Sequence, residues 1–234
     1  AWKSVTANSK NTFADGGHYY VNSDITSGQL VVSGGYEVVL LIDNATLRYQ
    51  GTSRMISLVG SDNKIAEPMS FHVIGNNGGC LQSKYTATTG TDGALVQVGG
   101  YDAGQLHLYG DLTVSMEDGS TAAEDGGLVK LPSNGGLYIH NNANMGLANN
   151  DDPTLVGHSA TGKGGVIFMQ SGDPVFKMEA GTIRGGNSTS SGGVIYLGDG
   201  TVEISGTAQI TGGTCGASGG IIFQNAGSTK IFGQ

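Results

Sequence analysis

Short apolar segments recur along this chain and alternate with polar, glycine-rich segments. Residues 164–168 read Gly-Gly-Val-Ile-Phe, residues 192–196 read Gly-Gly-Val-Ile-Tyr, and residues 219–223 read Gly-Gly-Ile-Ile-Phe. Second apolar segments follow at 176–179 and 202–205, and third ones at 182–183 and 209–210. Segments this short are typical of β-strands, and their recurrence every 27 or 28 residues predicts a structural repeat.

Strands of this length cannot bury a hydrophobic core alone, but stacked copies can. We therefore predict an all-β fold, a single-stranded right-handed parallel β-helix (solenoid) of about seven coils, each with three short strands. The hand follows from the strong preference of parallel crossovers. The expected first strands are 30–32, 55–59, 94–98, 127–131, 166–169, 194–197 and 221–223; the second are 38–42, 71–74, 106–109, 137–140, 175–179, 202–205 and 230–232; the third include 46–49, 81, 112–116, 144–147, 183 and 210.

The repeat predicts one β-helix domain over residues 1–234. Residues 1–27 repeat poorly, and we expect them to form an N-terminal cap, because terminal coils of solenoids are atypical. Extra residues at 61–68, 84–92 and 149–163 are expected to form outer loops. The C-terminal end stops after the second strand of its coil, so we expect residues 1–234 to provide no cap there. A continuation of the chain or a partner chain would then cover this end.

Composition agrees with a turn-rich β protein. Glycine accounts for 42 of 234 residues, and proline for only 4, which excludes collagen; so much glycine also disfavours a helical bundle. The net charge of −8 argues against nucleic acid as a partner, because nucleic acid requires clustered Lys and Arg. No apolar run reaches the ~20 residues of a membrane span, so no membrane insertion is expected.

The repeat Gly-Gly-Val-Ile-Tyr, Val-Glu-Ile-Ser-Gly-Thr-Ala-Gln-Ile, Gly-Gly at 192–213 resembles the coils of secreted right-handed parallel β-helix repeat proteins. These include adhesin-like bacterial surface proteins. Pectin-lyase-like enzymes share the fold, but no stretch of this chain matches their catalytic motifs. The resemblance covers about residues 160–234, and it implies an extracellular or bacterial cell-surface location.

The outward positions of the second strands hold the main candidate site. Alternate residues of a strand point to opposite faces, so the inward residues at 71, 106 and 137 leave histidine and tyrosine outward. Stacked coils would gather these side chains into one patch that binds a sugar or a transition metal, or that is an ordinary strand surface. The candidate ligand-binding residues are His72, His107, Tyr109, Tyr138 and His140.

Acidic residues provide a second candidate. Most aspartates fall at turns, where their side chains bond to the local backbone. Asp151 and Asp152 lie in an expected outer loop and are the candidate ligands for Ca²⁺, which prefers oxygen ligands. No other cofactor is expected. Cys80 and Cys215 are expected to be free thiols, because about four coils would separate them.

These observations favour a non-enzymatic secreted or cell-surface module. It would be adhesin-like and would bind a glycan or a host or cell-surface protein, or act as a stalk. One alternative is a polysaccharide lyase or glycoside hydrolase, which would need an outward acidic cluster with a Lys or Arg nearby. Another is an assembly module whose open end pairs with another chain or domain. The sequence offers no catalytic residues, and it leaves the question of enzymatic activity open.

Overall fold

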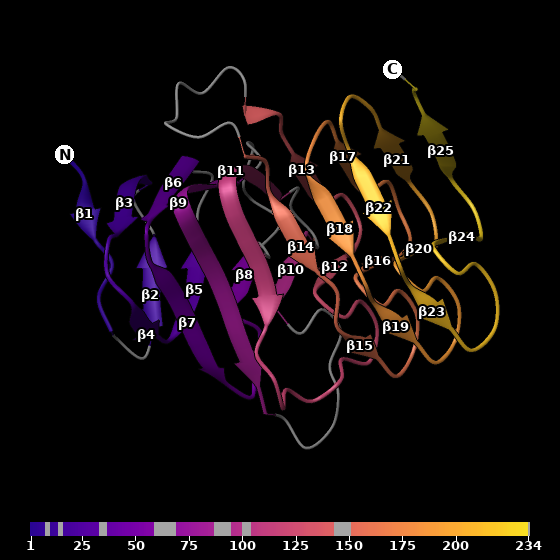
Figure 1. The fold of residues 1–234 in the computed structure, drawn as a ribbon, viewed down its shortest axis with the longest axis horizontal. Coiled ribbons are helices and arrows are strands. Elements are labelled where there is room, and N and C mark those ends of the chain that lie inside the picture. Colours follow the sequence, from indigo (N-terminus) through magenta and orange to yellow (C-terminus); the bar gives the residue numbers. More distant parts are fainter. Residues whose placement is uncertain are drawn as a thin grey trace.

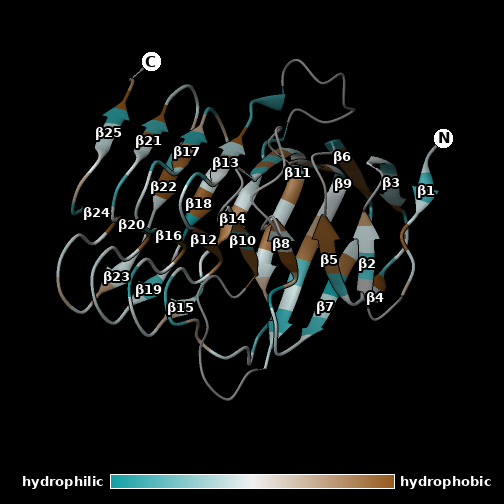
Figure 2. Ribbon diagram, turned by 180° about the vertical axis from the view of Figure 1, so that it is seen from behind, coloured by the Kyte–Doolittle hydropathy of each residue, from teal (hydrophilic) through white to brown (hydrophobic). Residues whose placement is uncertain are grey.

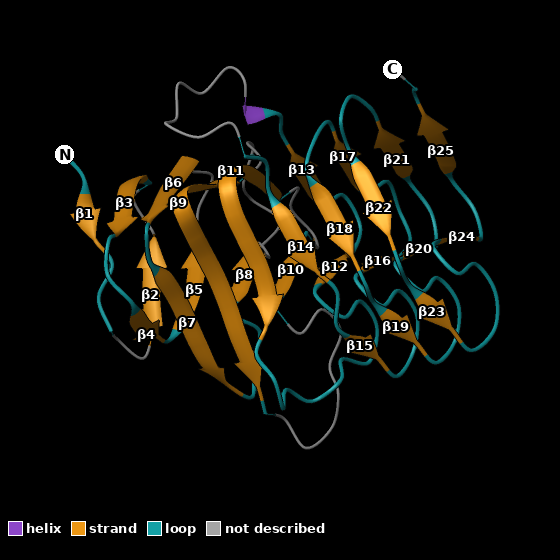
Figure 3. Cartoon of the chain, in the orientation of Figure 1, coloured by secondary structure: helices purple, strands orange, loops and turns teal. Residues whose placement is uncertain are grey.

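The chain is nearly all β-structure. The computed structural model describes residues 1–7, 10–13, 16–32, 37–58, 69–86, 95–99, 104–142 and 151–233. Within this part, strands and the loops that join them account for almost every residue (Figure 3). The N- and C-terminal strands lie at opposite ends of the long axis, and the strands between them are arranged in rows (Figure 1).

The described strands form three sheets. The largest, which we call sheet A, follows one main path and carries further strands beside it. Its main path is β1 (Lys3–Ser4), β3 (Gly17–Val21), β6 (Glu37–Asp43), β9 (Ser70–Tyr85), β11 (Gln105–Met116), β13 (Gly136–Ile139), β17 (Val175–Met178), β21 (Thr201–Ile204) and β25 (Ser228–Ile231). Beside this path lie β4 (Ile25–Ser27), β7 (Thr46–Gly51), β14 (Thr154–Val156), β18 (Thr182–Arg184) and β22 (Gln209–Thr211).

Two smaller sheets complete the fold. Sheet B is β2 (Lys10–Phe13), β5 (Gln29–Val32), β8 (Ile56–Leu58), β10 (Val96–Val98), β12 (Val129–Leu131), β16 (Ile167–Met169), β20 (Ile195–Leu197) and β24 (Ile222–Gln224). Sheet C is β15 (Ser159–Ala160), β19 (Asn187–Ser188) and β23 (Thr214–Cys215).

Every strand pairing in these sheets is parallel. From β12 onward the chain passes repeatedly through sheet B, sheet A twice, and sheet C before it returns to sheet B. Each passage places a strand next to its equivalent from the previous passage. The connecting loops follow nearly the same course each time (Figure 3). This arrangement is compatible with a parallel β-helix.

The hydrophobic core lies on the inward side of sheets A and B. One row of sheet A contains Phe71, Leu106, Leu137, Phe176 and Val202, which are almost completely buried. These residues alternate with half-buried or exposed neighbours, as expected for strands with one covered face. Figure 2 shows the hydrophobic colouring on strands such as β5 and the hydrophilic colouring on β19.

Glycine pairs allow successive passages of the chain to approach closely. A Cβ atom on Gly165 would collide with the backbone oxygen of Gly193, and one on Gly193 with that of Gly220. The residue before Gly193, Gly192, has a φ of 72°, which side chains disfavour. The repeated Gly-Gly pairs therefore stack directly on one another, which accounts for much of the unusual composition.

Within the described residues, most expected first and second strands are observed with shifts of one or two residues at their ends. The exceptions are β9 and β11, which run on from 71–74 and 106–109 to Tyr85 and Met116 and include the expected third strands at 81 and 112–116. The expected third strand at 144–147 lies outside the described residues. The position between β11 and β18 is occupied instead by β14, whose Thr154 pairs with Thr113 and Thr182. The expectation that 149–163 is entirely a loop is therefore wrong, because β14 and β15 lie within it. Residues 61–68 and most of 84–92 lie outside the described residues, whereas Lys84 and Tyr85 end β9.

Residues 1–27 contribute strands to the same sheets as the rest of the chain. β2 pairs with β5, β3 with β6, and β4 with β7. Their role as a cap stays a prediction. The expected free thiols are confirmed: Cys80 lies in β9 of sheet A and Cys215 in β23 of sheet C, and neither forms a disulfide.

Candidate functional site

The five predicted histidine and tyrosine side chains lie together on the outward face of sheet A. The register aligns His72, His107 and Tyr138 in one row across β9, β11 and β13. Tyr109 lies two residues further along β11, and His140 lies two residues after Tyr138, directly after the end of β13. We call these five residues the ring cluster. The structure thus brings together all five residues, while their role in binding stays a prediction.

The rings of the cluster stack face to face. The ring centroids of His72 and His107 are 4.5 Å apart, those of His107 and Tyr138 4.6 Å, and those of Tyr109 and His140 4.5 Å. The planes in these pairs differ by no more than 10°. The inner ring faces are therefore covered by one another. A ligand that approaches this face therefore meets mainly the ring edges, with their nitrogen and oxygen atoms.

Polar contacts fix the ring of His72. Its Nδ1 lies 3.1 Å from the hydroxyl oxygen of Tyr109, and its Nε2 lies 3.7 Å from a carboxylate oxygen of Glu37. The two contacts come from different strands, β11 and β6, on either side of β9. The hydrogen bond to Tyr109 restrains the His72 ring, and the Glu37 carboxylate approaches its opposite edge.

A second chain of contacts runs through His107. Its Nε2 donates to Oε1 of Gln105 at 3.3 Å, which leaves Nδ1 of a neutral ring as an acceptor. This Nδ1 lies 2.9 Å from Nε2 of His140, which then donates to it. On its other side, Nδ1 of His140 lies 3.4 Å from the Glu179 carboxylate. The two ring nitrogens of His140 are therefore both engaged by neighbouring side chains.

Burial lowers the pKa of two of the histidines. Burial, the largest cause, together with the neighbouring His72 and His140, lowers the pKa of His107 to about 3. Burial also lowers the pKa of His72, although Glu37 opposes this effect. Burial raises the pKa of both Tyr109 and Tyr138. A general base works best with a pKa near the working pH, so His107 is poorly suited to acid–base catalysis.

The remainder of this face carries alternating charges. Lys177 follows Tyr138 in the same row, and Glu203 and Lys230 come next. The Lys177 ammonium lies 2.8 Å from the Glu203 carboxylate, and Lys230 lies 3.4 Å from it. These exposed charges are engaged with one another beside the ring cluster.

The acidic pair Asp151 and Asp152 lies in an open hollow of about 420 Å³ on sheet A. Asp111, Thr154 and Gln209 also line it. Asp152 accepts a hydrogen bond from the backbone N–H of Asn142 at 3.0 Å, and Asp111 accepts one from that of Gly78 at 2.6 Å. Two of the three carboxylates thus bond to the backbone of other segments, Asp111 to that of β9 and Asp152 to that of the segment after β13.

Neither candidate site forms a cluster of metal ligands in the part of the chain that the structure describes. In the ring cluster, His107 and His140 direct nitrogen atoms at each other rather than at a common point. Binding of a transition metal is therefore not favoured by this geometry. Binding of Ca²⁺ near Asp151 and Asp152 stays a prediction.

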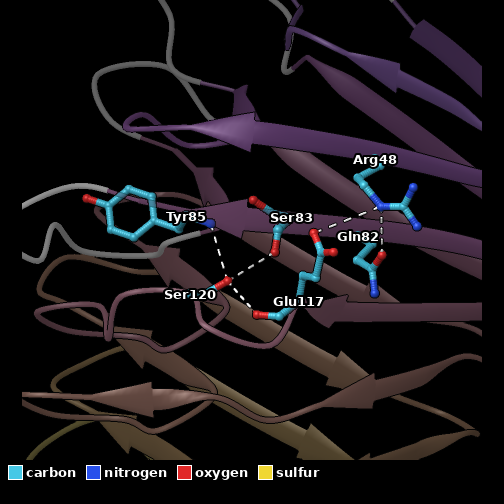
Figure 4. Close-up of polar contacts among 6 residues, drawn as sticks. All are labelled: Arg48, Gln82, Ser83, Tyr85, Glu117 and Ser120. Carbon is cyan, nitrogen blue, oxygen red and sulfur yellow. Dashed lines mark hydrogen bonds and ion pairs between the residues drawn. The ribbon is translucent and has the colours of Figure 1, made fainter.

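Another acidic side chain belongs to a structural network (Figure 4). The Arg48 Nε donates to Gln82 Oε1 at 3.1 Å and lies 4.0 Å from the Glu117 carboxylate. The Ser120 hydroxyl donates to the backbone oxygen of Glu117 at 2.6 Å and accepts from the backbone N–H of Tyr85 at 3.3 Å. These contacts tie the turn after β11 to β7 and β9, so we interpret them as support for the turn.

One feature of sheet A has no counterpart in the sequence predictions. A second hollow, of about 250 Å³, adjoins the ring cluster. It is lined by Gln105, Asn134, Gly135, Gly136, Tyr138, Asp173 and Val175. Register places Gly136 between Gln105 and Val175 in an outward row. The sequence signal that could have indicated this hollow is a glycine, Gly136, at an outward position between two larger residues.

The comparisons with known proteins add no relative. No family model, curated protein or solved structure matches this chain. Among the described residues, no helix is long and apolar enough to cross a membrane.

Proposed function

We propose that this chain is a non-enzymatic, adhesin-like module of a secreted or cell-surface bacterial protein, and that it binds a glycan along the outward face of sheet A. The observation that carries this proposal is the ring cluster, a set of five rings held parallel on one face. Contacts within the protein hold its polar edge atoms in fixed positions, and the Tyr138 hydroxyl forms no hydrogen bond with another described residue and is available to a ligand. A surface that is ordered before binding loses little conformational entropy when the ligand arrives.

The proposed scaffold is a right-handed parallel β-helix of about seven coils. Support comes from the uniformly parallel pairing and from the repeated order of the three sheets. The hand is the one that parallel crossovers almost always adopt. Such a scaffold holds side chains of successive coils at a spacing of ~4.8 Å, close to the repeat of stacked strands. An extended ligand can therefore contact several coils at once.

Polar hollows on both sides of the proposed face also favour a glycan. The hollow of about 420 Å³ is lined by carboxylate, hydroxyl and amide groups, and the hollow of about 250 Å³ by similar groups and Tyr138. Sugar hydroxyls both donate and accept hydrogen bonds, which such groups match. The net charge of −8 disfavours nucleic acid as the ligand.

The enzymatic alternative has one observation in its favour, the acidic hollow with Asp111, Asp151 and Asp152. Its described lining contains no Lys or Arg, and two of its carboxylates bond to backbone N–H groups. These facts favour binding over hydrolysis or elimination. An enzyme would release new sugar ends from a polysaccharide, and this release would stop in an Asp151→Asn, Asp152→Asn variant.

A glycan array tests the proposed function. We expect the wild-type chain to retain a set of oligosaccharides, and a His107→Ala, Tyr138→Ala variant to lose most of that retention. A Glu203→Ala, Lys230→Ala variant, altered in the same row beyond the cluster, serves as the matched control and keeps binding. Absence of retained glycans, or equal loss in both variants, contradicts the proposal.

A further inference from the structure

The hollow at Gly136 is a notch in an otherwise filled row of outward side chains. Gln105 precedes Gly136 in this row and Val175 follows it. Gly136 has no side chain, and the ring of Tyr138 leans over its backbone between the two neighbours. The Tyr138 ring forms a wall, since a Cβ atom on Gly136 would lie 2.6 Å from the Tyr138 Cε2.

The floor of the notch is bonded to the strands on both sides. The Gly136 N–H donates to the Gly104 oxygen at 2.9 Å, and the Gly135 oxygen accepts from the Val175 N–H at 2.8 Å. The turn before it closes with a bond of 3.1 Å from the Gly135 N–H to the Pro132 oxygen. The backbone under the hollow is therefore held in place before any ligand arrives.

Uncommitted polar groups surround this floor. The side chains of Asn134 and Asp173 and the hydroxyl of Tyr138 form no hydrogen bond or ion pair with another residue in the described ranges. Gln105 uses its Oε1 toward His107, which leaves its amide N–H groups available. The larger hollow differs in this respect, because Asp111 and Asp152 there are bonded to the backbone.

We infer that this notch is the subsite for one neutral sugar unit, an inference that rests on the proposed glycan-binding function. The amide of Gln105 on β11, the phenol of Tyr138 on β13, and the side chains of Asn134 and Asp173 in the loops before β13 and β17 can bond to the hydroxyls around one sugar ring. The volume of about 250 Å³ is below the ~300–1,000 Å³ of sites for drug-sized ligands, which fits a single small unit.

The charge of the site selects against acidic sugars. Asp173 lines the hollow, and no Lys or Arg is among the described residues that line it. The nearest cation in the sequence of β17, Lys177, is paired with Glu203 at 2.8 Å. A uronic acid would therefore bring its carboxylate next to Asp173 without a compensating charge, and like charges disfavour binding.

Amide chemical shifts of the ¹⁵N-labelled chain test this subsite. The probes are methyl glycosides of glucose, galactose and mannose, with methyl galacturonate salt as the acidic probe. We expect at least one neutral glycoside to shift the amides near 134–138 and 173–175, with Kd in the millimolar range expected of a single unit. The acidic probe should bind at least 10-fold more weakly.

Three variants sharpen the test. Gly136→Ala forces a methyl group against the Tyr138 ring, so that the ring must shift within the notch, and it should weaken binding of the neutral glycoside by at least 10-fold. Tyr138→Phe keeps the ring and removes the hydroxyl, so a several-fold loss is expected even if Gly136→Ala fails to fold. Asp199→Asn, at the corresponding corner one passage later, is the matched control and should leave binding unchanged.

The possible outcomes distinguish failure of the proposed sugar subsite from failure of the proposed glycan-binding function. If the array retains glycans but the glycosides shift amides elsewhere, or the notch variants bind normally, the subsite is wrong and the proposed function stands. Equal binding of the acidic and neutral probes also overturns the subsite. If the array retains nothing, the proposed function fails, and the subsite fails with it.

Discussion

Acid should destabilise the fold through the ring cluster, and a single substitution isolates this effect. His107 has a pKa of about 3 in the folded chain, against 6.5 for an unperturbed histidine. Below pH 6.5 the unfolded chain takes up a proton that the folded chain refuses until about pH 3. Stability from a neutral His107 is therefore fully present above pH 6.5 and is lost as the pH falls toward 3.

The size of the loss follows from the same pKa. A pKa difference of one unit corresponds to ~1.4 kcal/mol, so the upper limit for His107 is ~5 kcal/mol. Because the ring is only half-buried, water screens part of this energy, and we expect a loss of about 2 kcal/mol between pH 7 and 4. Burial lowers the pKa of His72 and His158 in the same direction, so they add to the effect.

The variant for this test is His107→Phe, which keeps a ring between His72 and Tyr138 but cannot titrate. It also loses the hydrogen bonds to His140 and Gln105, so its stability at pH 7 differs from wild type by ~1 kcal/mol. The pH dependence, rather than the absolute stability, is therefore the quantity to compare. Glu37, Glu179 and Lys177, which surround the cluster, are unchanged in this variant.

Urea unfolding followed by far-ultraviolet circular dichroism at pH 7, 6, 5 and 4 provides the measurement. Wild type should lose about 2 kcal/mol more than His107→Phe over this range. His18→Phe, at a histidine outside the cluster and in contact with Trp2, should follow wild type. Parallel pH curves for wild type and His107→Phe would refute the argument that burial keeps His107 neutral.

Three further predictions concern the scaffold. Phe176→Ala removes a fully buried ring from the inward row, and urea unfolding should show a loss of ~3–5 kcal/mol. Gly193→Ala forces a methyl group against the Gly220 backbone and should cost ~1–3 kcal/mol in the same assay, whereas Gly220→Ala, with open space around it, should cost much less. Glu203→Gln removes the ion pairs to Lys177 and Lys230. Any decrease in the thermal midpoint of this variant should be small and should disappear in 1 M NaCl, because salt screens exposed charges. A decrease that persists in 1 M NaCl would argue against an electrostatic origin.

The sequence predicted the parts of the fold that repeat. Gly-Gly pairs followed by Val-Ile or Ile-Ile marked β16, β20 and β24, because both close packing and burial select these residues at the same place in each passage. Alternation along 106–109 and 137–140 also predicted which side chains face outward. The resulting alignment of His72, His107 and Tyr138 is observed.

Other features were missed because their causes are not local. Sheet C has strands of two residues, such as Asn187–Ser188, whose polar side chains show no β pattern. The segment at 144–147 has the apolar character of a third strand, but β14, at Thr154–Val156, takes that place through its pairing with β11 and β18. β9 and β11 run on through an expected corner, with a change of register near Asp111.

The candidate site was predicted in position but not in geometry. The sequence brought the five ring residues together, yet it could not indicate that the rings cover one another's faces, since side-chain rotation decides this. The notch at Gly136 was missed because it arises from the absence of a side chain. Only the alignment with Gln105 and Val175 shows that this absence leaves a hollow.

The central claim is that the chain binds a glycan and leaves it intact. The most direct measurement incubates the chain with the oligosaccharide that it retains best on the array, isolates the complex by size-exclusion chromatography, and determines the mass of the bound sugar. If the chain binds the glycan without cleaving it, the oligosaccharide should co-elute with the protein at its original mass after prolonged incubation. Absence of co-eluting sugar, or recovery of shorter fragments, would contradict it.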